Sequence, residues 1–109
     1  MTLDEYQADA MRTMARREPV AAELDRAIMG LGLTGESGEV AELLKKNLGH
    51  GHELNPDALT KELGDVLWYV SAIATQHGLS LGTIADQNIA KLRIRYPEGF
   101  SHAASRERT

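Results

Sequence analysis

Residues 36–65 read ESGEVAELLKKNLGHGHELNPDALTKELGD, and this stretch decides how the rest of the chain is interpreted. It begins with Glu36 and Glu39 and ends with Glu62 and Asp65, two acidic pairs that are each spaced i, i+3. On a helix this spacing places both carboxylates of a pair on one face, one turn apart, where like charges repel. Hard oxygen donors of this kind suit Mg²⁺ or Mn²⁺. We therefore expect two helices to present the four carboxylates to a divalent metal that handles a phosphate substrate.

The sequence argues against three other kinds of site. A di-iron bundle needs Glu-x-x-His on two helices, and neither acidic pair has a histidine at that place. An EF-hand calcium loop needs a D-x-[DN]-x-[DN]-G run, which the chain lacks. Residues 30–35 read GLGLTG, but no strand pattern precedes them, so a dinucleotide-binding fold is not expected. A solvated helix face remains the plain alternative to a metal site.

The composition limits the classes of function. The 109 residues suggest one domain, with a small core that self-association would enlarge. A net charge of −4 argues against a nucleic-acid partner, which would need clustered positive charge. The absence of cysteine excludes disulfides, zinc–thiolate sites and thiol catalysis. No apolar run approaches the roughly 18 residues of a membrane span, and no signal pattern opens the chain, so we expect a cytoplasmic protein.

Start and stop signals divide the chain into four helices, and no segment shows convincing strand alternation. Thr2 and Glu5 form a capping box, whereas Asn55 before a proline and Ser80 are further N-caps. The expected helices run from 3 to about 16–18, from about 20–23 to 47–49, from 56 to about 77, and from 81 to about 96. Short connections favour an all-α, four-helix-bundle architecture. We expect a single domain over residues 1–100, followed by a flexible tail at 101–109.

Four glycines interrupt the second helical pattern, at positions 30, 32, 35 and 38. A glycine in a helix interior costs about 1 kcal/mol relative to alanine. We therefore expect either a break in this helix or the close approach of another backbone or a ligand.

Several polar and aromatic residues outside the acidic pairs are candidates for ligand contacts. Asn88, Lys91 and Arg95 share one helix face, where they can meet phosphate oxygens or only favour the negative end of the helix dipole. Trp68 lies one turn past Asp65, and its ring either stacks on a nucleobase or packs in the core or a subunit interface. In the pair YQ (6–7), either one residue reaches a ligand or the tyrosine is half-buried and the glutamine solvated.

Three segments carry a likeness to a known family: GESGEVAEL (35–43), KELGDVLWY (61–69) and NIAKLRIRYP (88–97). Together they resemble the MazG-type nucleoside triphosphate pyrophosphohydrolases, and YQ (6–7) also fits. The resemblance covers roughly residues 3–100 and shows no departure at the metal-binding positions. It implies an all-α fold that assembles as a homodimer or homotetramer, with the site at or near a subunit interface.

The resemblance also implies an activity. This is Mg²⁺-dependent cleavage of a nucleoside triphosphate between its α- and β-phosphates, giving the monophosphate and pyrophosphate, with Mn²⁺ as a possible substitute and nucleotide-pool house-cleaning as the purpose. The implied metal ligands are Glu36, Glu39, Glu62 and Asp65. Glu36 or Glu39 would orient or deprotonate the attacking water. The expected substrate-binding residues are Asn88, Lys91, Arg95, Trp68 and Gln7. The alternative is a non-catalytic helical module that binds nucleotide and metal or another protein.

Overall fold

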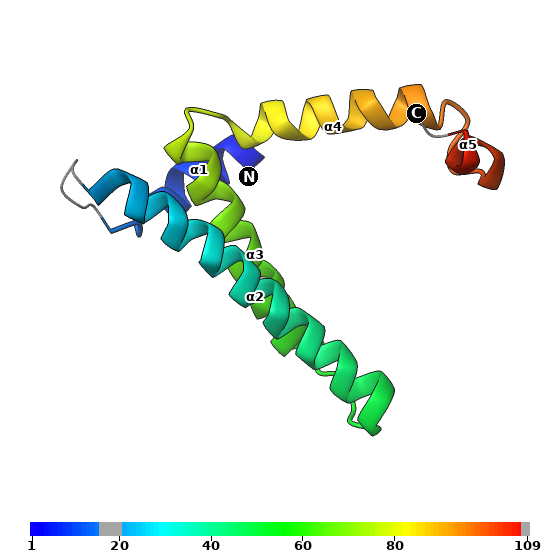
Figure 1. The fold of residues 1–109 in the computed structure, drawn as a ribbon, viewed down its shortest axis with the longest axis horizontal. Helices are drawn as coiled ribbons and strands as arrows, with labels where there is room; N and C mark the ends of the chain where they lie inside the picture. Colours follow the sequence, from blue (N-terminus) through cyan, green and yellow to red (C-terminus); the bar gives the residue numbers. More distant parts are fainter. Residues whose placement is uncertain (16–20, 108–109) are drawn as a thin grey trace.

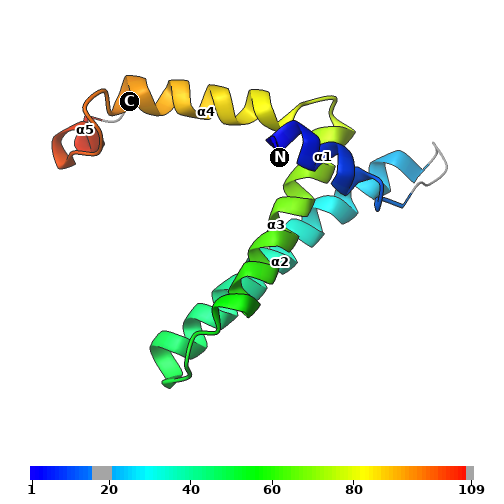
Figure 2. The ribbon, with the colours of Figure 1, turned by 180° about the vertical axis from the view of Figure 1, so that it is seen from behind.

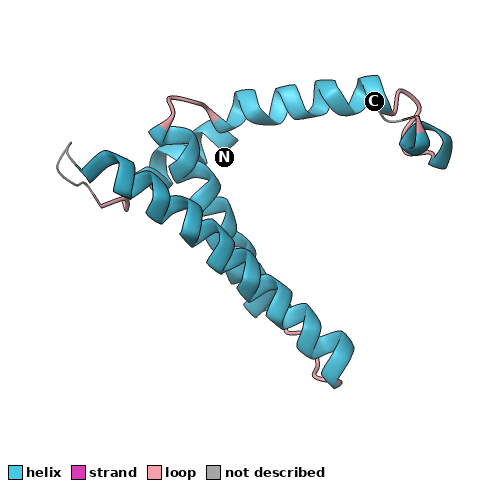
Figure 3. Ribbon diagram, in the orientation of Figure 1, coloured by secondary structure: helices cyan, strands magenta, loops and turns pink. Residues whose placement is uncertain are grey.

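The computed structural model describes residues 1–15 and 21–107, and five helices make up the regular structure of these residues (Figures 1 and 3). The helices are α1 (Leu3–Met11), α2 (Ala22–His50), α3 (Pro56–Gln76), α4 (Leu81–Arg95) and α5 (His102–Arg106). No β-strand is formed within the described ranges, so the expected all-α class is confirmed. None of the helices described is both long and apolar enough to cross a membrane.

The two longest helices, α2 and α3, lie side by side as a hairpin (Figures 1 and 2). Helix α2 runs unbroken for 29 residues despite its glycines. At Gly32 an added Cβ would overlap the ring of Tyr69, which α3 presses against the α2 backbone. The helix does not break, and the close neighbour at Gly32 is a side-chain ring rather than the backbone or ligand that was expected; the glycine makes room for that ring, so that the two helices pack. Gly30, Gly35 and Gly38 have no such neighbour within 4 Å.

The predicted helix caps are present. Thr2 and Glu5 exchange both hydrogen bonds of a capping box at the start of α1. The Asn55 side chain accepts hydrogen bonds from the second and third residues of α3. The Ser80 hydroxyl accepts one from the Thr83 amide of α4, at 3.1 Å. Each cap satisfies amides that a helix N-terminus leaves unpaired, which is why these residue types fix the boundaries.

Helix α1 ends earlier than the sequence predicts. It stops at Met11, whereas the expected end at 16–18 lies outside the described residues. The Ala10 carbonyl accepts hydrogen bonds from the Thr13 amide and hydroxyl, and a third from the Trp68 indole at 3.3 Å. These contacts tighten the last turn, and a side chain 58 residues away takes part in it.

Helix α4 contacts α1 at its root and projects away from the hairpin in both views (Figures 1 and 2). The radius of gyration is 17.2 Å, against about 13 Å expected for a compact chain of this length. Beyond α4, residues 102–106 form the short helix α5, within the segment 101–109 that was expected to be a flexible tail. The Ser101 hydroxyl caps α5 by accepting from the Ala104 amide at 3.0 Å.

The core of the described chain is small. Its buried apolar residues are Ala72 and Ala74 of α3 and Leu81 of α4. Fourteen large apolar side chains are exposed, and Leu48 and Ile94 each keep more than four-fifths of their surface open. Isolated exposed apolar residues are ordinary, but this number on an elongated chain leaves much of the helical stripes uncovered.

Candidate metal centre

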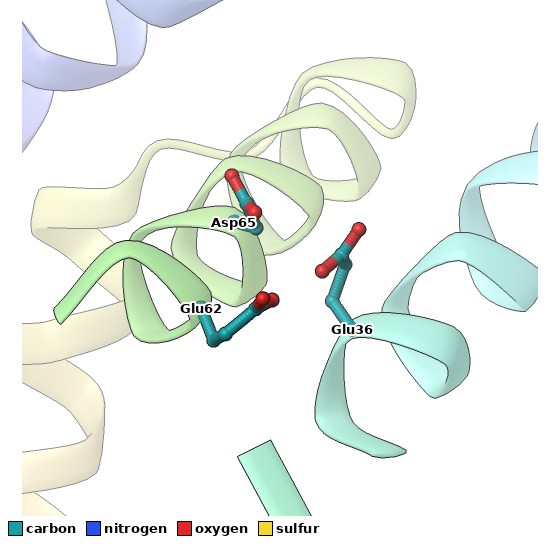
Figure 4. Close-up of side chains that lie close together, drawn as sticks. All are labelled: Glu36, Glu62 and Asp65. Carbon is teal, nitrogen blue, oxygen red and sulfur yellow. The ribbon is translucent and has the colours of Figure 1, made fainter. Parts of the chain in front are cut away.

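Three of the four predicted metal-binding carboxylates meet between α2 and α3. Glu36 comes from α2, and Glu62 and Asp65 come from adjacent turns of α3 (Figure 4). One oxygen from each residue lies within 4.8 Å of the others. We call these three residues the acidic cluster. Glu39 lies one turn beyond Glu36 on α2, is exposed, and stays outside this group.

The electrostatics of the acidic cluster are unfavourable without a cation. The pKa of Glu36 is raised, and the largest cause is partial burial of its carboxyl group. A side-chain hydrogen bond with Glu62 raises this pKa further. The negative charges of Asp65, Glu62 and Glu39 add to the same shift. Glu36 is therefore held toward its protonated form by its neighbours. No described lysine or arginine forms an ion pair with the cluster.

This donor set fits a divalent metal. All the available ligand atoms are carboxylate oxygens, which Mg²⁺ and Mn²⁺ prefer. Softer metals prefer sulfur or imidazole ligands, and the cluster offers neither. The cluster is partly open, with Glu36 and Glu62 half-buried and Asp65 exposed, so water and substrate can share the coordination sphere. A bound cation would offset the repulsion that raises the pKa of Glu36.

A hollow of about 340 Å³ lies beside the acidic cluster. It is lined by Glu36, Asp65, Trp68 and Tyr69, and we call it the acidic hollow. The Trp68 indole N–H donates to the Thr13 hydroxyl at 2.8 Å, so its polar edge is occupied and the ring forms a wall. Tyr69 packs edge-to-face on Trp68, with ring centroids 5.0 Å apart. The hollow thus joins an acidic side to an aromatic side.

Residues 25–100 match the family model described as the MazG nucleotide pyrophosphohydrolase domain. The match covers most of the chain, including the acidic cluster and α4. This chain belongs to the MazG nucleotide pyrophosphohydrolase family.

A phage protein is similar to this MazG chain over nearly its whole length. The "Gene 37 protein" of Mycobacterium phage L5 is 40% identical over 108 residues, which covers 91% of this chain and 92% of the phage protein. Its name states no activity. No solved structure matches the chain.

The predicted phosphate-binding residues of the MazG chain lie on α4, away from the acidic hollow. Asn88 and Lys91 are exposed, and Arg95 is half-buried. Lys91 and Arg95 line a separate cavity of about 860 Å³ between the end of α4 and the segment 97–107. The acidic and basic candidates therefore do not meet within one chain.

Gln7 is also not brought to the acidic hollow. Its side-chain amide makes hydrogen bonds to the last turn of α3, to the α3–α4 connection and to α4. In one chain, the polar atoms of Gln7 are therefore bonded to other parts of the same protein. Its predicted contact with substrate stays a prediction.

Two aromatic residues lie near the site: Tyr69, which was not among the predicted site residues, and Tyr6, which was considered only as one of the pair YQ (6–7). Tyr69 lines the acidic hollow, and its signal in the sequence is its helical spacing from Glu62 and Asp65. Tyr6 of α1 has its pKa raised by burial and, secondarily, by the charge of Asp65. The first helix thus comes within electrostatic range of the acidic cluster, which no pattern within α1 reveals.

Proposed function

We propose that this chain is a Mg²⁺-dependent nucleotide pyrophosphohydrolase. It cleaves a ribo- or deoxyribonucleoside triphosphate between the α- and β-phosphates and releases the monophosphate and pyrophosphate. The observation that carries the proposal is the convergence of Glu36, Glu62 and Asp65 beside an aromatic-walled hollow in a MazG family chain. Mn²⁺ is the expected substitute for Mg²⁺, because it accepts the same oxygen donors.

Each residue of the site has its own role in the proposed reaction. Glu36, Glu62 and Asp65 hold the metal, with Glu39 as a further ligand or as the base. Bound Mg²⁺ lowers the pKa of a coordinating water and offsets charge on the phosphate oxygens. Glu39 is exposed and one turn from Glu36, so it can orient or deprotonate the water that attacks phosphorus. The Trp68 ring in the wall of the hollow offers a face for the nucleobase.

The phosphate-binding residues come from a second copy of the chain. Helix α4, which we call the arm, projects from the hairpin and carries Asn88, Lys91 and Arg95 (Figure 1). The exposed apolar residues of the arm include Ile89, Leu92 and Ile94. A helix with an uncovered apolar stripe gains stability by packing on another chain. A homodimer or homotetramer would bury this stripe and bring one copy's Lys91 toward the other copy's acidic cluster. There the lysine would offset charge on the departing pyrophosphate.

The physiological setting follows from the proposed reaction. Conversion of a triphosphate to a monophosphate removes it from the pool of polymerase substrates. We therefore propose nucleotide-pool house-cleaning in the cytoplasm as its purpose.

A product-release assay tests the proposed function. The protein is incubated with Mg²⁺ and a panel of NTPs and dNTPs, and the products are separated by anion exchange. We expect monophosphate and pyrophosphate, with turnover abolished by EDTA. Inorganic phosphate and diphosphate would place the cleavage at another bond. No turnover of any nucleotide would favour the alternative, a non-catalytic nucleotide-binding or protein-interaction module.

A further inference from the structure

We propose that Asp4 and Gln7 of α1 are positioning residues that fix the direction in which α4 leaves the hairpin. Neither is a group that reacts. Their action is on the helix that carries Lys91, so the kinetic part of the inference rests on the proposed function. The structural part, the direction of α4, does not.

Gln7 spans the junction between α3 and α4 with one amide group. Its Nε2 donates to the Thr75 hydroxyl at 2.9 Å and to the Leu79 carbonyl at 3.0 Å. Its Oε1 accepts from the Leu81 amide at 2.8 Å. A single side chain therefore contacts the last turn of α3, the connecting turn and the first residue of α4. Leu81 itself is buried, and its bond to Gln7 is partly shielded from water.

Asp4 binds the next amide of the same helix. Its Oδ1 accepts from the Gly82 amide at 2.8 Å. A carboxylate at a helix N-terminus also interacts favourably with the helix dipole. A Cβ on Gly82 would lie only 2.9 Å from the Asp4 Oδ2, so the glycine leaves room for the carboxylate to approach. Of the first three amides of α4, two are bound by α1 side chains and the third by the Ser80 cap.

Helix α1 is itself fixed to the hairpin by a separate contact. The Trp68 indole of α3 donates to Ala10 and Thr13 at the end of α1. Beyond its root, α4 lies away from α2 and α3 (Figures 1 and 2). The direction of α4 in one chain is therefore set by α1 and the connecting turn.

A small change in this direction has a large effect at Lys91. Lys91 lies ten residues after Leu81, which is about 15 Å along a helix axis. A tilt of about 20° at the root would displace it by about 5 Å at that radius. Because a misplacement of about 1 Å can cost about 100-fold in rate, such a tilt would remove a phosphate contact.

A distance measurement tests the direction of α4 without any catalysis. The chain has no cysteine, so Lys45→Cys on α2 and Arg93→Cys on α4 give two unique spin-label sites on exposed residues. The labelled chain is diluted with unlabelled wild type, and the distance within one chain is measured by pulsed electron resonance. We expect one narrow distribution for the parent and a distribution shifted or broadened by several Å in Gln7→Ala and Asp4→Ala. Unchanged distributions in both variants would overturn the inference.

Matched variants separate positioning from a general loss of structure. Asp4→Asn keeps the Oδ1 acceptor and should restore the parent distribution, whereas Asp9→Ala on the exposed far side of α1 and Gln87→Ala on α4 should not alter it. If Gln7→Ala fails to fold, Asp4→Ala and Gly82→Ala decide the proposal, because both break the contact of the Asp4 carboxylate with α4 and leave Gln7 unchanged. A parent-like distribution in folded Gly82→Ala and Asp4→Ala would refute the role of Asp4.

Kinetics test whether the direction of α4 matters to the site. With an active parent enzyme, Asp4→Ala should lower kcat/KM for the nucleotide at least about 10-fold, mainly through KM, and Asp4→Asn should recover it. A shifted distance with unchanged kcat/KM would overturn the link between α4 and the site. If the parent hydrolyses no nucleotide, the proposed function fails, while the distance measurement still decides the positioning.

Discussion

Helices α3 and α4 differ in what covers them, although both begin at caps that the sequence predicts. Helix α3 packs against α2 and α1, and Ser71, Ala72 and Ala74 are buried there. In α4 the buried residue is Leu81 at the root, and Ile94 near the end is 84% exposed. Spacing of apolar residues predicts a helix in both cases. It does not say whether the partner that buries the stripe is in the same chain.

The acidic and basic residues of the predicted site lie on different sides of this contrast. The acidic cluster lies between α2 and α3, where the chain packs on itself, and Lys91 and Arg95 lie on the uncovered arm. If the two halves of the site come from different copies, changes on each side should have distinct signatures. The experiments below use that difference, from the largest expected effect to the smallest.

The largest effect is expected on the covered side, at Glu36. Glu36→Gln removes a ligand charge and should lower kcat/KM at least about 100-fold, because even outer partners of metal ligands are typically worth 10- to 100-fold. The fold should persist, since the change also removes like-charge repulsion within the acidic cluster. Turnover and circular dichroism check both parts. Glu53→Gln in the exposed α2–α3 loop is the matched control, and near-parental activity of Glu36→Gln would contradict the metal assignment.

On the arm, Lys91→Ala should raise KM by about 10-fold or more, through loss of one charged hydrogen bond to phosphate. Mixing this variant with Glu36→Gln tests the comparison directly. If each site joins one copy's acidic cluster to the other copy's Lys91, each mixed dimer should have one intact site, and a random 1:1 mixture, in which half of the dimers are mixed, should regain about one quarter of the parental sites. If both residues act within one chain, mixed dimers should each keep one Glu36-deficient and one Lys91-deficient site, and no intact site would appear. Lys45→Ala is the control for loss of an exposed lysine.

A smaller effect, on stability, is expected from glycines of α2. Gly32→Ala places a methyl group against the Tyr69 ring and should lower the free energy of unfolding, because overpacking costs about 1–3 kcal/mol against a helix gain of about 1. Gly30→Ala meets no neighbour and should gain up to about 1 kcal/mol. Urea unfolding measures both. A loss at Gly30 would instead indicate that a second copy covers that face.

The smallest effect concerns pH in the absence of metal. The folded-state pKa of Glu36 is raised above 4.5, so the folded chain holds this proton more tightly than the unfolded chain. The resulting stabilisation is complete below pH 4.5 and is lost as pH rises through the raised pKa. In EDTA, the melting temperature of Glu36→Gln should therefore rise relative to that of the parent as pH rises across that range. A difference in melting temperature that does not change with pH would contradict the raised pKa of Glu36. Mg²⁺ binds the parent and should therefore reduce the difference in melting temperature at high pH.

The sequence is a good guide wherever the deciding contacts are local. Thr2, Asn55 and Ser80 cap their own helices through bonds to residues two or three positions away, and these caps are confirmed. The i, i+3 spacing likewise brings Glu62 and Asp65 together, because one helix holds both. Their meeting with Glu36 was a hypothesis about facing helices, and the structure bears it out for three of the four carboxylates.

Predictions that depended on distant contacts fared less well. The predicted end of α1 was wrong: its last turn closes with local bonds from Thr13 to the Ala10 carbonyl, and Trp68, 55 to 58 positions away, binds the same turn. Helix α5 was missed because its Ser101 cap begins a segment of only five residues, which is too short for a periodic pattern. The arm formed by α4 was not foreseen, since its direction depends on α1 side chains that carry no mark of that role in the sequence.

The place of Trp68 also gives the molecule an optical property. It is the single tryptophan of the chain, and its ring forms a wall of the acidic hollow. When the indole is excited selectively over the three tyrosines, its emission is therefore a signal from one known position. Excitation of the unlabelled protein during a Mg²⁺ or nucleotide titration reads the occupancy of the hollow directly. Because the indole N–H is bonded to Thr13, the same emission also reports when α1 detaches from the hairpin.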